Sequence, residues 1–157
     1  MIIYGKTEWE RDFKEVIELC GTWWKESLFY KLYGIEYDVD VDLFQRLKDA
    51  EGLIYTIGRE NGMVISCYVG IKSPYLFNPK VLTATEVVWC IRKENRCFKN
   101  LVCLIRAIET LMDEENLKLW NLNVSNEEKY ESTGKFLTLK GYDFMDKCFS
   151  KLRTKNG

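Results

Sequence analysis

The fold of this chain is decided by the stretch Thr85-Glu86-Val87-Val88-Trp89-Cys90-Ile91, which continues into Arg92-Lys93-Glu94-Asn95-Arg96. Residues 81–91 are rich in β-branched and aromatic side chains, which predicts a strand buried over much of its length. A polar, basic stretch follows over residues 92–100. The next segment is an amphipathic helix, and its expected core face consists of Leu101, Leu104, Ile105, Ile108, Leu111 and Met112. A strand, a basic turn and a helix in this order are typical of an α/β protein.

Two more strands are predicted before this unit, over residues 53–59 and 63–72. They are joined by Glu60-Asn61-Gly62, and an Asn-Gly step between two apolar runs is a strong hairpin signal. Pro74 and Pro79 are expected to bound the connection to the third strand, with Tyr75 and Phe77 exposed in it.

The N-terminal third is predicted to be helical. Residues 8–32 carry apolar side chains at helical spacing, and an acidic stretch follows over residues 36–42. A second helix is expected over residues 41–50. Asp40 and Asp42 suit the start of that helix, because carboxylates are favoured there by the helix dipole. We prefer this interpretation to calcium binding, since the EF-hand spacing and its closing glutamate are missing.

The C-terminal part predicts a strand over residues 117–124, a helix over residues 126–140 with Gly141 as its C-terminal cap, and a last strand over residues 142–153. The expected order of elements is therefore α-α-β-β-β-α-β-α-β. Without a linker, repeat or low-complexity tract, residues 1–157 are expected to form a single domain.

Composition excludes several kinds of chemistry. The sequence has no histidine, so a Ser-His-Asp or Cys-His nucleophile and an imidazole zinc site are impossible. Its 23 basic and 24 acidic side chains give no overall attraction to nucleic acid or to anionic membranes. No apolar stretch reaches the length of about 20 residues that spans a bilayer. We therefore expect a soluble protein with no membrane partner.

The six cysteines form no Cys-x-x-Cys pair: Cys20, Cys67, Cys90, Cys97, Cys103 and Cys148. Most lie inside apolar runs, where a free thiol behaves as a small hydrophobic side chain. No secretory segment opens the sequence. We expect reduced, structural cysteines in a cytoplasmic protein.

Several motifs between residues 13 and 152 match one known family in order and spacing. Glu86 and Trp89 form a Glu-x-x-Trp strand, the turn ends in Arg96, and the helix carries Ala107-Ile108-Glu109. Residues 134–142, Gly-Lys-Phe-Leu-Thr-Leu-Lys-Gly-Tyr, are similar to the family's Gly-x-x-Tyr-x-x-x-Gly-Tyr ending. The chain thus resembles the Gcn5-related N-acetyltransferases, most of all the small members encoded by tailed bacteriophages. The resemblance implies an α/β fold of the GNAT type, a mixed twisted β-sheet flanked by helices on both faces.

The resemblance also implies where acetyl-CoA would bind. The backbone of Trp89, Cys90 and Ile91 would hold the pantetheine arm. The pyrophosphate would lie on the turn formed by Arg96, Cys97, Phe98, Lys99, Asn100 and Leu101. Both glycine positions of the family's turn are filled here, by Lys99 and Leu101. Two interpretations stay open: the Lys99 ammonium contacts phosphate instead of backbone N–H groups, or coenzyme binding has been lost.

For catalysis, the resemblance indicates Glu86 as the general base that deprotonates the acceptor amine. A carboxylate partly buried beside Trp89 would have a raised pKa, which suits a base near neutral pH. The alternative is a glutamate that faces solvent or pairs with a basic neighbour. The family's tyrosine acid is replaced by Leu137. One of Trp23 and Trp24 is expected to face the acceptor groove, because adjacent helical residues do not share a face.

Two hypotheses of different class result. The first is an acetyl-CoA-dependent N-acetyltransferase that acts on an amine of a protein or a small molecule. The second is a catalytically inactive GNAT-fold phage protein, present in the host cytoplasm, that binds a host or virion protein through Tyr75, Phe77 and the acidic residues 36–42. Nucleic-acid modification is a third and weaker option, because the overall charge is balanced. Relatives often pair through sheet edges, so a homodimer is one assembly that the resemblance implies.

Overall fold

The computed structural model describes residues 2–124 and 130–144. In chain order its helices and strands are β1 (Ile3–Gly5), α1 (Trp9–Trp24), α2 (Leu28–Tyr33), α3 (Val41–Asp49), β2 (Leu53–Glu60), β3 (Met63–Tyr75), β4 (Asn78–Ile91), the short 3-10 turn η1 (Lys93–Asn95), α4 (Phe98–Glu114), β5 (Leu119–Trp120) and α5 (Tyr130–Leu139).

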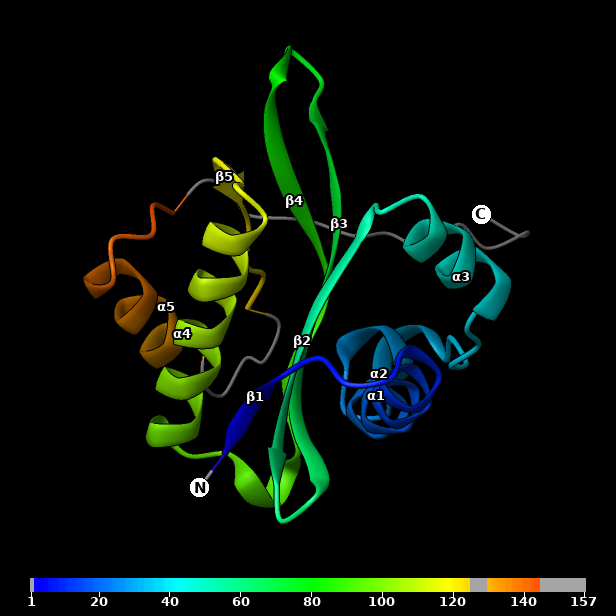
Figure 1. The fold of residues 1–157 in the computed structure, drawn as a ribbon. Coiled ribbons are helices and arrows are strands. Elements are labelled where there is room, and N and C mark those ends of the chain that lie inside the picture. The colour runs from blue at the N-terminus through cyan, green and yellow to red at the C-terminus, as the bar shows by residue number, and fades with distance from the viewer. Residues whose placement is uncertain (1, 125–129, 145–157) are drawn as a thin grey trace, which may run out of the picture.

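The five strands form one sheet in the order β1-β2-β3-β4-β5. The first three pairings are antiparallel and the last, between β4 and β5, is parallel. Helices α1 to α3 lie on one face of this sheet, and α4 and α5 lie on the other (Figure 1). The predicted fold class, a mixed sheet flanked by helices on both faces, is confirmed.

The two hairpins differ in how well the sequence predicts them. The turn between β2 and β3 is formed by Asn61 and Gly62, both with positive φ (53° and 80°), as an Asn-Gly hairpin requires. The predicted connection between Pro74 and Pro79 is wrong, because both prolines lie inside strands. Pairing of β3 with β2 ends at Ile71, and pairing of β4 with β5 involves only Thr83 and Ala84 among the described residues, so the hairpin beyond these residues is a two-stranded ribbon with open edges. Proline is tolerated there because no ladder hydrogen bond needs its missing N–H.

Helix boundaries also depart from the sequence pattern. The helix expected over residues 8–32 is interrupted after Trp24, and α2 starts behind Ser27, whose hydroxyl accepts a hydrogen bond from the N–H of Tyr30 at 3.3 Å. The sequence feature that indicates this break is Ser27, a residue type that commonly caps the start of a helix, although the apolar pattern around it is continuous. The helix expected over residues 41–50 is confirmed as α3. Its N-cap is Asp40, whose carboxylate accepts the N–H of Leu43 at 2.8 Å.

The outer strands were predicted less well than the inner ones. Strand β1 was missed, because three residues are too short to show a period. Among the described residues, the strand expected over residues 117–124 pairs only at Leu119 and Trp120. Residues 142–144 are not a strand, and the remainder of the strand expected over residues 142–153 lies outside the described residues. The helix expected over residues 126–140 is observed as α5 from Tyr130.

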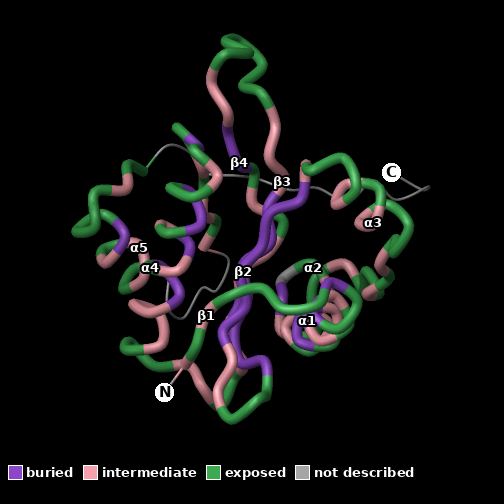
Figure 2. Tube along the Cα trace, in the orientation of Figure 1, coloured by how far each residue is buried: buried purple, intermediate pink, exposed green. Residues whose placement is uncertain are grey.

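The core forms two layers, one on each face of the sheet, and Figure 2 shows the buried residues running along the central strands and the inner sides of α1 and α4. The predicted core face of α4 is confirmed: Leu101 is partly buried against the core, and the other five predicted residues, Leu104, Ile105, Ile108, Leu111 and Met112, are buried. On the α1 face, three free cysteines from α1, β3 and β4 meet in the core. Their sulfur atoms are 4.0 Å apart for Cys20 and Cys67 and 3.7 Å apart for Cys67 and Cys90.

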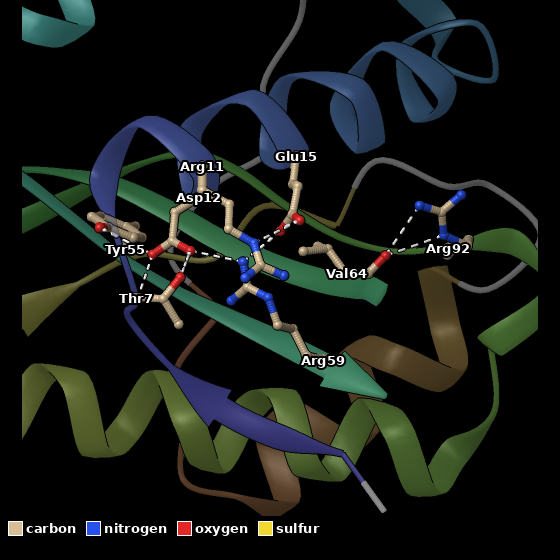
Figure 3. A network of polar contacts seen from close by, with 8 residues as sticks. All are labelled: Thr7, Arg11, Asp12, Glu15, Tyr55, Arg59, Val64 and Arg92. Carbon is tan, nitrogen blue, oxygen red and sulfur yellow. Dashed lines mark hydrogen bonds and ion pairs between the residues drawn. The ribbon is translucent and has the colours of Figure 1, made fainter. Parts of the chain in front are cut away.

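A network of charged groups ties α1 to β2 (Figure 3). The fully buried carboxylate of Asp12 accepts a hydrogen bond from the backbone N–H of Thr7 and another from Arg59, each at 2.7 Å. Arg59 also pairs with Glu15. Burial alone would raise the pKa of Asp12, but the bonds from Thr7 and Arg59 outweigh it and hold this pKa below its ordinary value. The network therefore stays ionised and fixes α1 against the sheet.

Among the described residues, no helix is both long enough and apolar enough to cross a membrane.

Candidate active site

A β-bulge in β4 sets the geometry of the candidate site. Gly70 of β3 pairs with Glu86, and the next residue, Val69, pairs with Val88, so Val87 is an extra residue without a partner on β3. An extra residue reverses the alternation of side chains along a strand. Before the bulge Ala84 faces α4, and after it Trp89 faces α4 while Val88 faces α1.

The pairing of β4 with β5 ends just before this bulge. Only Thr83 and Ala84 of β4 pair with β5 within the described residues. Beyond that point, three side-chain contacts join β4 to the segment after β5. Glu86 donates its backbone N–H to the side chain of Asn121, the Glu86 carboxylate accepts the N–H of Asn123, and the Trp89 indole donates to the Asn123 carbonyl at 2.7 Å.

Glu86, the predicted base, lies where β4 and β5 separate. The residue is half-buried, and its carboxylate accepts hydrogen bonds from the backbone N–H and the side chain of Asn123. Burial raises the pKa of Glu86 to about 7, and the bonds from Asn123 oppose that rise without cancelling it. A carboxyl group that titrates near neutral pH can accept a proton from an amine under ordinary conditions. The predicted environment of Glu86 is thus observed, and its role stays a prediction.

Tyr68 is a second polar group near Glu86, and no sequence motif predicts its role. Tyr68 is fully buried on the α4 face of β3, and its hydroxyl has no hydrogen-bond partner among the described residues. Burial, and then the negative charge of Glu86, raise the pKa of this hydroxyl above its ordinary value. The side chain lies over Gly70, where a Cβ atom would come within 2.6 Å of the hydroxyl oxygen. A buried hydroxyl beside a carboxylate is a candidate proton donor, but it resembles any core tyrosine in sequence.

The start of α4 has the features of an anion site. Its N-cap, Cys97, makes no side-chain hydrogen bond to the helix. The first-turn N–H groups therefore have no side-chain cap, and the helix dipole adds partial positive charge there. Lys93 and Lys99 are exposed beside this end. Both observations fit a phosphate group, which the residues Cys97, Phe98, Lys99 and Asn100 would contact.

Three residues predicted for the phosphate turn have other contacts. Arg96 donates to the carbonyl of Ile91 at 2.9 Å and to the carboxylate of Glu26 at 2.5 Å, so it ties the turn to the end of α1. Asn100 donates from its amide to the carbonyl of Asn95 at 2.7 Å. Leu101, which replaces a glycine of the family turn, packs into the core on the α4 face. Its side chain therefore points away from the exposed lysines of the turn.

The other predicted positions divide between the two faces. Trp89 and Ile91 pack on the α4 face, whereas Cys90 belongs to the cysteine cluster on the α1 face. Leu137, at the position of the family's tyrosine, is buried on the α4 face and offers no proton.

A cavity of about 350 Å³ lies on the α1 face, between α1, the segment that joins α2 to α3, and the sheet. Val87 and Val88 form its wall on β4, directly after Glu86. Both Trp23 and Trp24 line it, where the sequence predicted only one of them. Adjacent helical residues share the cavity because α1 ends there and the connecting segment wraps around its last turn.

The wall opposite the sheet is held onto α1 by two aromatic side chains. The Trp24 indole donates to the carbonyl of Ile35 at 2.7 Å, and the Tyr37 hydroxyl donates to the carbonyl of Ile17 at 3.0 Å. The Tyr37 ring lies against Gly21, where a Cβ atom would be only 3.1 Å from a ring carbon. These contacts fix the segment, and with it the cavity, without a ligand.

Comparison with known proteins places this geometry in a fold family. No family model matches the chain, and no curated protein sequence matches it significantly. Solved structures do match. The chain is similar to an aminoglycoside acetyltransferase from an uncultured soil metagenomic sample, with 10% identity, a TM-score of 0.68, and coverage of 98% of this chain and 96% of that one. The chain has the GNAT acetyltransferase fold.

Two further acetyltransferases match over nearly their whole length. Glucosamine-6-phosphate N-acetyltransferase from Arabidopsis thaliana has 12% identity and a TM-score of 0.68, with coverage of 97% and 98%. A predicted acetyltransferase from Clostridium acetobutylicum, solved with acetyl-CoA, has 17% identity and a TM-score of 0.65, with coverage of 97% and 96%. At this identity the match establishes the fold, and the activity has to be argued from the site.

Proposed function

We propose that this protein is an N-acetyltransferase that moves an acetyl group from acetyl-CoA to the amine of a small molecule. The observation that carries the proposal is the position of the cavity on β4. It ends on Val87 and Val88, one residue after Glu86 and just past the point where β4 leaves β5. An acceptor in the cavity on the α1 face and a thioester bound where β4 and β5 separate would then meet at the same part of β4.

The residues present fit the coenzyme at two places. The α4 start, without a side-chain cap and with Lys93 and Lys99 beside it, suits a pyrophosphate. Beyond Ala84, the β4 backbone has no ladder partner on its β5 side among the described residues, which leaves the backbone of Trp89, Cys90 and Ile91 for the pantetheine arm, although the Ile91 carbonyl also accepts the hydrogen bond from Arg96. Bound acetyl-CoA would supply an activated acetyl thioester.

In the proposed reaction, Glu86 accepts the proton of the acceptor amine through water, because its side chain lies on the α4 side of β4 and does not line the cavity. Its pKa of about 7 allows it to be ionised at neutral pH and to become protonated during the reaction. The proton for the departing thiolate would come from water or from the buried Tyr68 hydroxyl. Two hydrogen bonds hold Glu86 in place: its backbone N–H donates to the side-chain oxygen of Asn121, and its carboxylate accepts the backbone N–H of Asn123.

Calorimetric titration with acetyl-CoA and with free CoA tests the proposal first. We expect micromolar binding, about −8 kcal/mol. Replacing both exposed lysines of the turn, Lys93→Gln with Lys99→Gln, should weaken CoA binding, and Lys80→Gln on the distant hairpin is the matched control. Absence of heat at millimolar acetyl-CoA, with a folded protein, would overturn the proposal.

Acetylation of an amine panel, followed by mass spectrometry of the products, is the second test. Glu86→Gln should lower the rate and remove its rise with pH near 7, while CoA affinity stays unchanged. A Glu86→Gln variant with unchanged kinetics would remove the assigned base.

One observation favours the alternative, a protein-binding role. The β3–β4 hairpin projects beyond the sheet, and its tip is exposed (Figures 1 and 2). Leu76 and Phe77 at that tip are 85% and 83% exposed. Exposed apolar residues on a projecting ribbon are common contact sites. If acetyl-CoA does not bind, loss of partner capture by a Leu76→Ser, Phe77→Ser variant would support this role.

A further inference from the structure

The cavity on the α1 face is lined by aromatic rings and carboxylates. Its polar side chains are few, and among the described residues that line it none is a lysine or arginine. Its aromatic lining consists of Trp9, Phe13, Trp23, Trp24, Tyr37, Phe44 and Tyr55. Electron-rich ring faces attract a cation, particularly when the site is shielded from water.

The carboxylates of the cavity differ in whether their charge is already compensated. Asp12, at the Trp9 end, forms an ion pair with Arg59, which compensates its negative charge. Asp40 caps α3. Glu36 and Asp38 lie at the exposed rim, and no described residue forms an ion pair with either of them. The rim is therefore the part of the cavity with uncompensated negative charge.

Three basic side chains contact lining residues at the other end of the cavity. Arg59 contacts Asp12, Lys48 lies 5.8 Å from the centre of the Trp9 ring, and Lys6 lies 5.4 Å from that of Tyr55. Charge thus varies along the cavity, with compensated groups near Trp9 and free carboxylates near Trp24. A ligand that carries positive charge would be oriented by this difference.

We propose that the acceptor of this cavity is a small diamine or polyamine with an apolar stretch between its amino groups. This inference rests on the proposed function. One ammonium would be held by Glu36 and Asp38, and the apolar stretch would lie against the aromatic rings. A volume of about 350 Å³ suits a ligand of this size.

Two amino groups are needed because the held ammonium cannot be the nucleophile. Neighbouring carboxylates favour the charged form of an amine, and a protonated amine has no lone pair with which to attack a thioester. The amine that accepts the acetyl group must lie away from the rim, against Val87 and Val88 on β4. There the surroundings are apolar, which favours the neutral, reactive form.

The same lining argues against acidic acceptors. A phosphorylated amino sugar would bring two negative charges to a cavity whose rim is already negative and whose described lining residues include no lysine or arginine. The substrate named for the Arabidopsis thaliana neighbour, glucosamine-6-phosphate, therefore does not suit this cavity. An amino acid with a free carboxylate is disfavoured for the same reason.

Binding measured without coenzyme tests the inference separately from catalysis. Cadaverine, pentylamine, aminocaproate and glucosamine-6-phosphate would be titrated by calorimetry. We expect cadaverine to bind about tenfold more tightly than pentylamine or aminocaproate, and no binding of the phosphorylated sugar. Raising the salt from roughly 0.02 M to 0.5 M should weaken the cadaverine complex.

A pair of double variants with the same change in charge sharpens the test. Glu36→Gln with Asp38→Asn should weaken cadaverine binding about tenfold. Glu18→Gln with Asp42→Asn removes two exposed carboxylates that do not line the cavity, and it should leave binding unchanged.

The outcomes separate the inference from the proposed function. Cadaverine binding without any CoA binding would support the cavity assignment and overturn the transferase. Acetylation of a phosphorylated or monoamine acceptor, with no cadaverine binding, would support the transferase and overturn the diamine assignment. Equal losses in the two double variants would also overturn it, because general charge and not the rim would then govern binding.

Discussion

The ring of Tyr37 packs against Gly21 in the last turn of α1, so closely that a Cβ atom on Gly21 would be 3.1 Å from a ring carbon. A glycine inside a helix normally costs stability relative to alanine. Here the lack of a side chain allows the segment between α2 and α3 to approach the helix and to close one wall of the cavity. The cavity thus depends on a residue that is unfavourable for the helix itself.

Alanine at this glycine is expected to bring little or no gain in stability. Gly134→Ala in α5 is the matched control, since nothing lies within 4 Å of its added Cβ. The control should gain about 0.8 kcal/mol in unfolding free energy, whereas Gly21→Ala should gain less because the Tyr37 ring has to move. Urea unfolding measures both. Equal gains would show that Tyr37 moves freely and does not fix the wall.

Asp12→Asn should destabilise the protein by about 3 kcal/mol. The substitution leaves the Arg59 guanidinium with Glu15 as its remaining ion-pair partner and removes a fully buried charge that four hydrogen bonds satisfy. Arg11→Ala, which removes only an exposed pair with Glu15, is the control and should cost less than about 0.5 kcal/mol. A small effect of Asp12→Asn in chemical denaturation would mean that water or another group compensates Arg59.

The same network predicts a loss of stability in acid. The folded-state pKa values of Asp12 and Glu15 lie below their ordinary values, so both groups release protons more readily in the folded protein. The stability that they contribute is present above the ordinary pKa values and is lost as pH falls through the lowered ones. The Asp12→Asn variant should therefore lose less stability than the wild type between about pH 5 and about pH 3. Parallel curves would contradict this assignment.

The contribution of Glu86 to stability should depend on pH in the opposite direction. Its folded-state pKa, about 7, lies above its ordinary value, so the folded protein favours the protonated form. The stability gained from this group is present at low pH and is lost as pH rises through about 7. Glu86→Gln should therefore gain in melting temperature relative to the wild type from about pH 5 to about pH 8.5. Glu94→Gln, an exposed position, is the control and should follow the wild type.

How far the sequence predicts this molecule depends on how local each signal is. The Asn61-Gly62 turn, the core face of α4 and the cap at Asp40 are encoded within a few residues, and all three are confirmed. The prediction that Pro74 and Pro79 bound a connection is wrong because the effect of a proline on a strand depends on residues far away in sequence. Whether a proline disrupts a strand depends on whether another strand lies at that edge, and the extent of β2 is not visible in the β3 sequence.

The candidate site was only partly predictable for the same reason. Glu86 could be predicted from the motif that contains it. The bulge at Val87, however, changes which side chains of β4 face each side of the sheet, and no residue type in the sequence predicts a bulge at this position. Tyr68 and Gly21 acquire their importance only from side chains far away in sequence. Arg96 carries a family motif, yet here it contacts Glu26, which lies 70 residues away.

The cysteine cluster should resist chemical labelling while the protein is folded. Cys67 is fully buried, and its contacts with Cys20 and Cys90, together with burial, raise the pKa of its thiol well above the ordinary value. A protonated, inaccessible thiol reacts slowly, because the thiolate is the nucleophile. Cys97 is exposed and should be labelled rapidly by iodoacetamide.

Peptide mass spectrometry after a short exposure distinguishes these sites, and the unfolded protein, in which all six cysteines should react, is the control. Labelling of Cys67 as fast as Cys97 would show that the α1 face opens readily, and the cavity built on that face would then not be a fixed site.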